Sequence, residues 1–159
     1  MNMTMLRYFF EKTSDNQAYL FEGLAITTYP EYIKHQGQYP VIYLSLKDVK
    51  GVSWHECKKR LNEKIEELIL NFHYLAHAIQ TIHKSGYTAL ITGTADDATL
   101  KGSLKNLVTW LYEYHKMPVI VLIDEYDSPM IEAWNHGYYN EIAEFLRSWL
   151  GGGLKQSRI

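Results

Sequence analysis

The stretch Val119-Ile120-Val121-Leu122-Ile123-Asp124-Glu125 decides the fold of this chain. Its first five residues are apolar and do not alternate with polar ones, which indicates a strand buried on both faces at the centre of a parallel sheet. Residues 41–46 (Val-Ile-Tyr-Leu-Ser-Leu) form a second strand-like run, and Pro40 is tolerated at its entrance. Two strands joined by long helices predict an α/β fold with parallel strands, although two strands alone make an incomplete sheet.

Helical spacing of apolar residues marks most of the remaining chain. A capping box, Ser53 with Glu56, predicts a helix that begins at Trp54 and continues, with room for a break on the way, to about Gly86. Ser128 as cap, with proline next to it, predicts another helix start. Further helices are expected over residues 3–12, 98–115 and 138–150, with short helical pieces at 20–26 and 31–35 and a loop or frayed helix at 88–92.

The composition limits the classes of protein to which the chain can belong. The 159 residues suit one domain, and the contents of 47% apolar and 21% charged residues suit a globular protein. The formal charge of -2 argues against a strongly basic surface for nucleic acid. No apolar run approaches the roughly 20 residues that span a bilayer. The single cysteine, Cys57, excludes an internal disulfide framework and suits the reducing cytoplasm.

Two adjacent acids follow the buried strand, at the end where open α/β sheets bind their ligands. Asp124 can hold Mg²⁺, usually through water, and Glu125 can orient or deprotonate an attacking water. An apolar strand followed by Asp-Glu is the Walker B pattern of P-loop ATPases. Two other interpretations stay open: an acidic turn that caps the helix at Ser128, and a phosphohydrolase or nuclease that uses Asp124, Glu125 and Asp127 as a carboxylate cluster.

Six short motifs follow one another along the chain. They are residues 5–11 (Met-Leu-Arg-Tyr-Phe-Phe-Glu), 20–24 (Leu-Phe-Glu-Gly-Leu), 39–48 (Tyr-Pro-Val-Ile-Tyr-Leu-Ser-Leu-Lys-Asp), 122–129 (Leu-Ile-Asp-Glu-Tyr-Asp-Ser-Pro), 137–139 (Gly-Tyr-Tyr) and 145–148 (Phe-Leu-Arg-Ser). In this order they resemble the prokaryotic AAA-ATPase-like family. The resemblance implies an incomplete P-loop NTPase-like three-layer core, ATP and Mg²⁺ as ligands, Asp124 as the metal-associated acid and Glu125 as the catalytic acid. Members of the family often carry a restriction-endonuclease-like nuclease domain at the C-terminus.

The chain departs from the family pattern at the phosphate-binding loop. No G-x-x-x-x-G-K-[ST] motif occurs in it, and Gly151-Gly152-Gly153-Leu154-Lys155 lacks the required spacing. The polar sensor strand expected after Lys155 is also absent. Residues 1–159 are therefore expected to form a partial domain that binds neither ATP nor Mg²⁺ tightly alone and that self-associates through an open sheet edge. A non-catalytic interaction module is the alternative, and the expected partners are ATP in the complete domain and a nuclease domain or another protein.

Weaker signals complete the set of candidates. His73 and His77, four residues apart on a predicted helix, suit either a shared metal or a solvated or partner-facing edge. Cys57 falls on an apolar stripe and is expected in the core, and Asp96 with Asp97 is expected to cap the helix that follows. One basic set is expected to be a solvated face rather than a DNA contact, and one aromatic set is expected to line an exposed surface. The basic set is Lys47, Lys50, Lys58, Lys59 and Arg60, and the aromatic set is Trp134, Tyr138, Tyr139 and Trp149.

Overall fold

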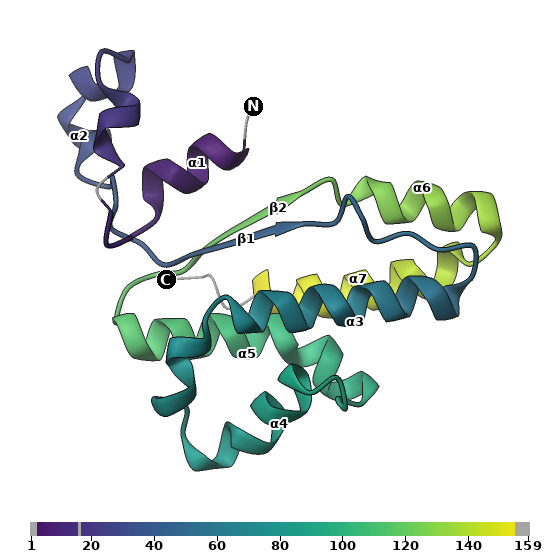
Figure 1. Ribbon diagram of the computed structural model, residues 1–159. Helices are drawn as coiled ribbons and strands as arrows, with labels where there is room; N and C mark the ends of the chain where they lie inside the picture. The colour runs from purple at the N-terminus through teal and green to yellow at the C-terminus, as the bar shows by residue number, and fades with distance from the viewer. Residues whose placement is uncertain (1–2, 16, 155–159) are drawn as a thin grey trace.

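The computed structural model describes residues 3–15 and 17–154, and helices predominate in it (Figure 1). Two strands, β1 (Val41–Ser45) and β2 (Ile120–Asp124), lie among them. None of the described helices is both long enough and apolar enough to cross a membrane. The α-helices are α1 (Met3–Phe10), α2 (Pro30–Ile33), α3 (Trp54–Leu70), α4 (Thr81–Ile91), α5 (Asp97–His115), α6 (Asp127–His136) and α7 (Tyr139–Leu154), and the 3₁₀-helices are η1 (Ala18–Phe21), η2 (Ala25–Thr28) and η3 (His73–His77).

The strands β1 and β2 form a parallel pair, as the sequence predicts. Val41 lies opposite Ile120 and Ser45 lies opposite Asp124, so both strands end at the same edge of the sheet. The burial of β2 differs from the prediction, because each of its residues is half-buried rather than buried on both faces. The sheet of the described residues has only these two strands, which leaves β2 with an unpaired edge. The fold is mostly helical with a small parallel sheet, which is consistent with the predicted α/β class.

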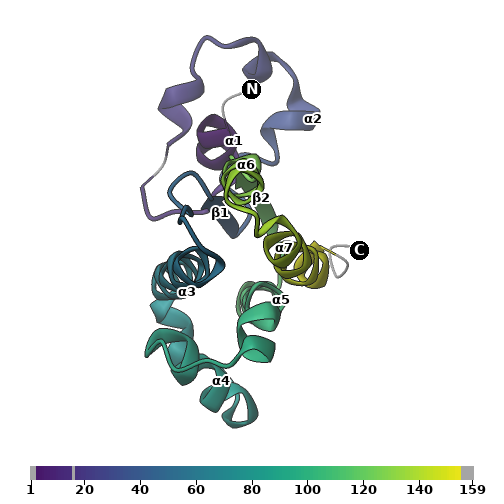
Figure 2. The same cartoon turned by 90° about the vertical axis from the view of Figure 1, so that its right-hand side faces the viewer.

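The two faces of the sheet carry different layers of helices (Figure 2). Side chains alternate along a strand, so Ile42 and Leu44 point to one face, where they join the main core with residues of α3, α5 and α7. Tyr43 points to the other face, where Arg7 of α1 lies over its ring. The sheet is thus placed between α1 on one side and the longer helices on the other.

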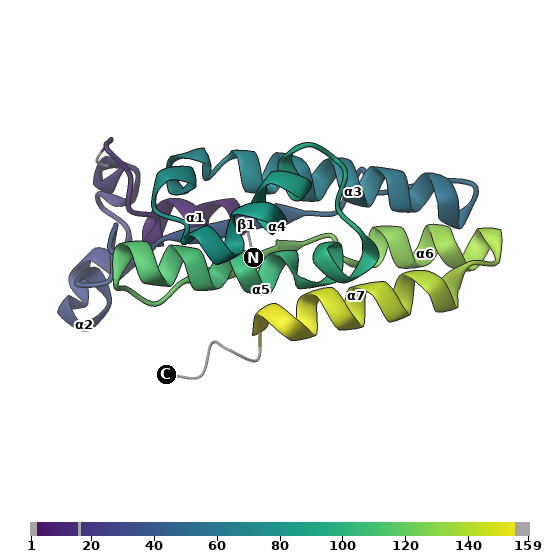
Figure 3. The same ribbon diagram turned by 90° about the horizontal axis from the view of Figure 1, so that it is seen from below.

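The long helices α3, α5 and α7 run alongside one another on one side of the sheet (Figure 3). Their starts follow the predicted caps. The Glu56 amide donates to the Ser53 hydroxyl at 3.3 Å at the start of α3. The Thr99 amide donates to the Asp96 carboxylate at 2.8 Å at the start of α5. The caps at Ser53 and Asp96 are confirmed. The Glu56 carboxylate reaches back one residue further than the capping box predicts, because it accepts from the Val52 amide at 3.1 Å.

The long helix predicted from Trp54 is divided into three pieces. The helix α3 ends at Leu70, and the chain continues through η3 and α4, in which Leu75 and Leu90 are buried. Because the chain turns after α3, Leu75 and Leu90 can pack in the main core. Gly86 lies inside α4 rather than at its end, and residues 88–92 mostly complete this helix.

The last helix is longer than predicted. It does not end at Leu150 but includes the three following glycines and continues to Leu154. The reason lies in its packing on α5, because a Cβ at Gly153 would meet Leu104 Cγ at 2.7 Å. Trp149 in the same helix is fully buried, and its indole N–H donates to the Ser103 hydroxyl of α5 at 2.8 Å. The prediction that no sensor strand follows Lys155 concerns residues 155–159, which lie outside the described part of the chain.

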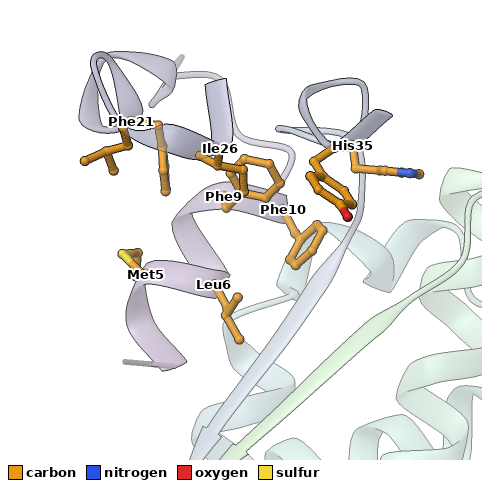
Figure 4. A pocket seen from close by; sticks show the side chains of 9 residues that line it. Met5, Leu6, Phe9, Phe10, Phe21, Ile26 and His35 are labelled. Carbon is orange, nitrogen blue, oxygen red and sulfur yellow. The ribbon is translucent and has the colours of Figure 1, made fainter. Parts of the chain in front are cut away.

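The described residues before β1 form a second, smaller apolar cluster. Lys12 donates its amide to the Tyr39 carbonyl at 2.8 Å, which ties the end of α1 to the approach of β1. The ring of Phe9 meets the ring of Phe21 edge-on, with centroids 5.2 Å apart. A cavity of about 310 Å³, lined by side chains such as Leu6 and Phe9, lies between α1 and the short helices (Figure 4).

Candidate active site

Asp124 and Glu125 lie where the sheet ends and α6 approaches. Asp124 is the last residue of β2, opposite Ser45. Glu125 follows with a φ of 52°, a left-handed conformation that residues with a side chain adopt rarely. The Glu125 amide donates to Asp124 Oδ1 at 3.0 Å, and the Glu125 carbonyl accepts from the Ser128 amide at 3.2 Å. This turn places both acids at the carboxyl edge of the parallel strands.

The structure does not support the interpretation that these acids cap α6. The N-cap of α6 is Tyr126, and the helix begins at Asp127, two residues earlier than predicted. Ser128 is therefore not the cap, because it already lies in the first turn and its amide bonds to the Glu125 carbonyl. The Asp124 carboxylate accepts from the Glu125 amide and from Tyr43 instead of from an amide of α6.

The strand β1 holds the Asp124 carboxylate from a second side. The Tyr43 hydroxyl donates to Asp124 Oδ2 at 3.2 Å. The guanidinium of Arg7 lies 5.8 Å from the centroid of the Tyr43 ring. It is also paired with Glu11, with Nε 2.9 Å from Oε2 and the second amino group 3.3 Å from Oε1. Sequence reasoning missed Tyr43 and Arg7, although the spacing of Arg7 and Glu11 by four residues on a helix is a readable sign of an ion pair.

A single carboxylate in this setting fits a Mg²⁺ ion that keeps most of its waters. Each oxygen of Asp124 accepts one hydrogen bond and retains a lone pair. Proteins usually bind Mg²⁺ through one or two carboxylates together with water and substrate phosphates. Within the described part of the chain, no three His, Cys, Asp or Glu side chains gather closely enough to hold a metal. The carboxylate cluster of Asp124, Glu125 and Asp127 is therefore not supported.

Cys57 is a core residue, as predicted. It is fully buried beside Tyr138, whose hydroxyl donates to the Gly51 carbonyl. Burial raises the pKa of the Cys57 thiol, the Tyr138 hydrogen bond opposes this rise, and the charge of Glu132 adds to it. Burial and the neighbouring Cys57 raise the pKa of Tyr138 to about 12. Both groups stay protonated at neutral pH, so this pair is structural rather than nucleophilic.

The helix η3 changes the meaning of the spacing between His73 and His77. A 3₁₀-helix has three residues per turn, so residues four apart lie on different sides, whereas an α-helix would place them on one face. Both histidines are exposed, and His73 Nδ1 lies 3.2 Å from the Leu70 carbonyl oxygen. This geometry favours the solvated edge over the shared metal.

The basic set is partly neutralised by acids. Lys58 pairs with Asp97 at the start of α5. Arg60 pairs with Glu63, one turn further along α3, at 3.3 Å. These contacts agree with the prediction of a solvated face rather than a DNA contact.

The aromatic set divides into an exposed pair and two core residues. Trp134 is 74% exposed, and its ring meets the ring of Tyr139 edge-on, with centroids 5.7 Å apart. Tyr138 and Trp149 are buried, so the prediction that they line an exposed surface is wrong. The reason is that Tyr138 packs beside Cys57, and Trp149 faces α5.

Comparison with known families identifies a match over the whole chain. The family model described as "Predicted AAA-ATPase" matches residues 1–159. No curated protein and no solved structure shows a significant match. The match covers every segment whose motifs resemble the AAA-ATPase-like family, from residues 5–11 to residues 145–148. The chain therefore belongs to the predicted AAA-ATPase family.

Proposed function

We propose that residues 1–159 form the acid-bearing part of an ATP-binding and ATP-hydrolysing domain with a P-loop NTPase-like core, and that they are not active alone. The observation that carries this proposal is the position of Asp124 and Glu125 at the carboxyl edge of the parallel pair β1–β2. Ligands of open α/β sheets bind at this edge. The description of the family supports the same activity.

The two acids have separate roles in this proposal. Asp124 would hold Mg²⁺ through water, with the lone pairs that its two hydrogen bonds leave free. The ion, when bound, supplies positive charge against the phosphates of ATP. Glu125, which the turn fixes directly after Asp124, would orient or deprotonate the attacking water. One acid thus acts on the metal and the other on the nucleophile.

The proposal includes a phosphate cradle that residues 1–159 do not supply. A cradle of the Gly-Lys-Thr type gives backbone N–H groups and a lysine to the phosphates, and the sequence contains no such motif. The chain alone should therefore lack most of its electrostatic anchor for ATP. A nuclease domain or another protein coupled to hydrolysis, and a cytoplasmic location suited to a single cysteine, belong to the same proposal.

A non-catalytic interaction module is the second candidate. Ile131 and Trp134 lie one turn apart on α6 and are 59% and 74% exposed, and Tyr126 just before the helix is 61% exposed. Large apolar side chains exposed together mark interaction surfaces. The coding sequence upstream of Met1 discriminates between the candidates. An in-frame strand with a Gly-Lys-Thr loop is expected for the ATPase, and a stop codon there favours the interaction module.

Substitution of the two acids tests the proposed roles in a longer chain that supplies the phosphate loop. Glu125→Gln should preserve ATP binding and lower turnover by about 10² to 10⁴, the usual effect of losing a general base. Asp124→Asn should instead weaken the dependence on Mg²⁺, because it removes the charge that faces the metal. The measurements are nucleotide affinity, Mg²⁺ titration and hydrolysis. Equal and mild effects of both substitutions on all three would overturn the proposal.

Calorimetry tests the part of the proposal that concerns residues 1–159 alone. Titration with Mg-ATP should show no binding tighter than roughly 1 mM, the weak end of ordinary substrate constants. The reason is the lack of the phosphate loop and its lysine. A micromolar constant would reveal a phosphate site within these residues and contradict the view that the chain is inactive alone.

A further inference from the structure

We propose that Tyr43 is a positioning residue for Asp124, and that the contact of Arg7 with the Tyr43 ring supports it in this role. The hydroxyl of Tyr43 would fix the direction in which the Asp124 carboxylate presents its free lone pairs to Mg²⁺. This inference rests on the proposed function, since it takes Asp124 to be the acid that faces the metal. It adds a residue of β1 and a residue of α1 to a site that the sequence places at the end of β2.

The register of the sheet brings Tyr43 to Asp124. Tyr43 lies opposite Leu122, and Asp124 is two residues further along β2. Residues two apart point to the same face of a strand and are separated by roughly 6.6 Å along it. A tyrosine side chain is long enough to span this offset, and its hydroxyl reaches Asp124 Oδ2 at 3.2 Å. The shorter side chain of Ser45, directly opposite Asp124, makes no such bond to it in the described structure.

Two hydrogen bonds hold the carboxylate from opposite sides. The Tyr43 hydroxyl donates to Oδ2, and the Glu125 amide donates to Oδ1 at 3.0 Å. With both oxygens engaged, rotation of the carboxylate would break at least one bond. The Glu125 amide belongs to the turn itself, so Tyr43 is the partner from outside that turn. Partners of this kind orient metal-binding carboxylates and tune their affinity.

The position of the Tyr43 ring depends in turn on α1. The Arg7 guanidinium lies over the ring at 5.8 Å from its centroid, within the range of a cation–π contact. Two hydrogen bonds to Glu11, one turn further along the chain, hold the guanidinium in place. The four side chains of Glu11, Arg7, Tyr43 and Asp124 therefore form a continuous series of contacts from the first helix to the end of β2.

The test compares Tyr43→Phe, which removes only the hydroxyl, with Tyr112→Phe, which makes the same change at an exposed tyrosine of α5. In residues 1–159, three-bond couplings measured by NMR report the χ1 angle of Asp124. Line broadening of the Glu125 amide by Mn²⁺ reports metal near the carboxylate. Tyr43→Phe should average the Asp124 couplings and lower the slope of broadening against Mn²⁺ concentration by about tenfold, the lower end for such partners. Tyr112→Phe should match the unaltered chain in both measurements.

Asp124→Asn separates the inference from the proposed function. If Asp124→Asn leaves the broadening of the Glu125 amide unchanged, Asp124 is not a metal ligand and both proposals fail. If the unaltered chain shows no broadening there, the Asp124 couplings in Tyr43→Phe alone decide whether Tyr43 positions the carboxylate. If Asp124→Asn removes the broadening and Tyr43→Phe changes neither the couplings nor the slope, only the role of Tyr43 is overturned. Averaged couplings together with a reduced slope in Tyr43→Phe support it. An increase in the slope would show that the hydroxyl competes with the metal, which also overturns it.

Discussion

The backbone of Glu125 adopts a conformation that is unfavourable for a residue with a side chain. Its φ of 52° lies in the left-handed region, which costs a residue with a Cβ about 1 to 2 kcal/mol. Lys116, the other described non-glycine residue of this kind, has a φ of 54° at the C-cap of α5, where left-handed residues commonly end helices. Glu125 ends no helix. Backbone strain at a charged residue that follows a strand is typical of functional sites.

Glycine substitutions test whether Glu125 is kept at a cost to stability. Glu125→Gly should raise the free energy of unfolding by about 1 kcal/mol, because glycine adopts a positive φ without a steric penalty. Lys116→Gly is the matched control with a similar φ of 54° and should give a similar gain. Urea unfolding of both variants measures the change. A loss of stability in Glu125→Gly alone would mean that the Glu125 side chain stabilises the fold, which weakens its assignment as a functional residue.

The two acids could be predicted from the sequence, but their partner could not. An apolar run followed by Asp-Glu is visible in one short window. The contact between Tyr43 and Asp124 joins residues 81 positions apart, and it depends on the register that sets Tyr43 opposite Leu122. A shift of the register by one residue would turn Tyr43 to the opposite face. The sequence predicts the two strands but not the register between them.

At the scale of elements, the contact between α5 and α7 depends on a glycine. A Cβ at Gly153 would lie 2.7 Å from Leu104 Cγ and 2.9 Å from Leu104 Cδ2, closer than such atoms approach. Leu104 is fully buried, so it has no solvent to move into. The bond from the Trp149 indole to the buried Ser103 hydroxyl fixes the same two helices one turn earlier in α7. The glycine therefore allows an approach that the hydrogen bond then holds.

Alanine substitutions in α7 test this close approach. Gly153→Ala should lower the free energy of unfolding by about 1 to 3 kcal/mol, the usual cost of overpacking a core. Gly151→Ala is the matched control, because nothing lies within 4 Å of its Cβ position. It should leave stability unchanged or raise it by up to about 1 kcal/mol, since alanine favours the helix. Chemical unfolding followed by circular dichroism measures both. Equal gains at the two positions would show that α7 does not approach α5 this closely.

Helix starts were more predictable than helix ends. Ser53 and Asp96 each accept from the amide three residues later, so the information lies within one turn of sequence. The end of α3 at Leu70 and the continuation of α7 through Gly153 depend on packing against residues far along the chain. The burial of β2 was overestimated for the same reason. Its apolar residues indicate what a strand could bury, and only the sheet shows how much is covered.

At the scale of the whole molecule, the two-stranded sheet has an edge without a hydrogen-bonding neighbour in the described residues. Only β1 pairs with β2 in the described residues. The Ile120 amide and the Asp124 carbonyl bond to backbone groups that flank β1, at 3.0 Å each. Because backbone groups alternate in direction along a strand, Val121 and Ile123 direct their N–H and C=O groups to the unpaired edge. Such an edge can recruit a strand from another chain.

We expect residues 1–159 to self-associate through this edge as their concentration rises, and Val121→Pro to reduce the association. A proline at Val121 removes an outward N–H and leaves the hydrogen bonds to β1 in place. Leu122→Pro is the control, since the Leu122 amide faces β1 by the same alternation and its loss should break the pair. Light scattering measures the mass, and circular dichroism reports whether each variant is folded. A chain that stays monomeric at high concentration contradicts the expectation. A folded Val121→Pro variant that still associates would place the contact elsewhere, with the exposed Trp134 on α6 as the next surface to test.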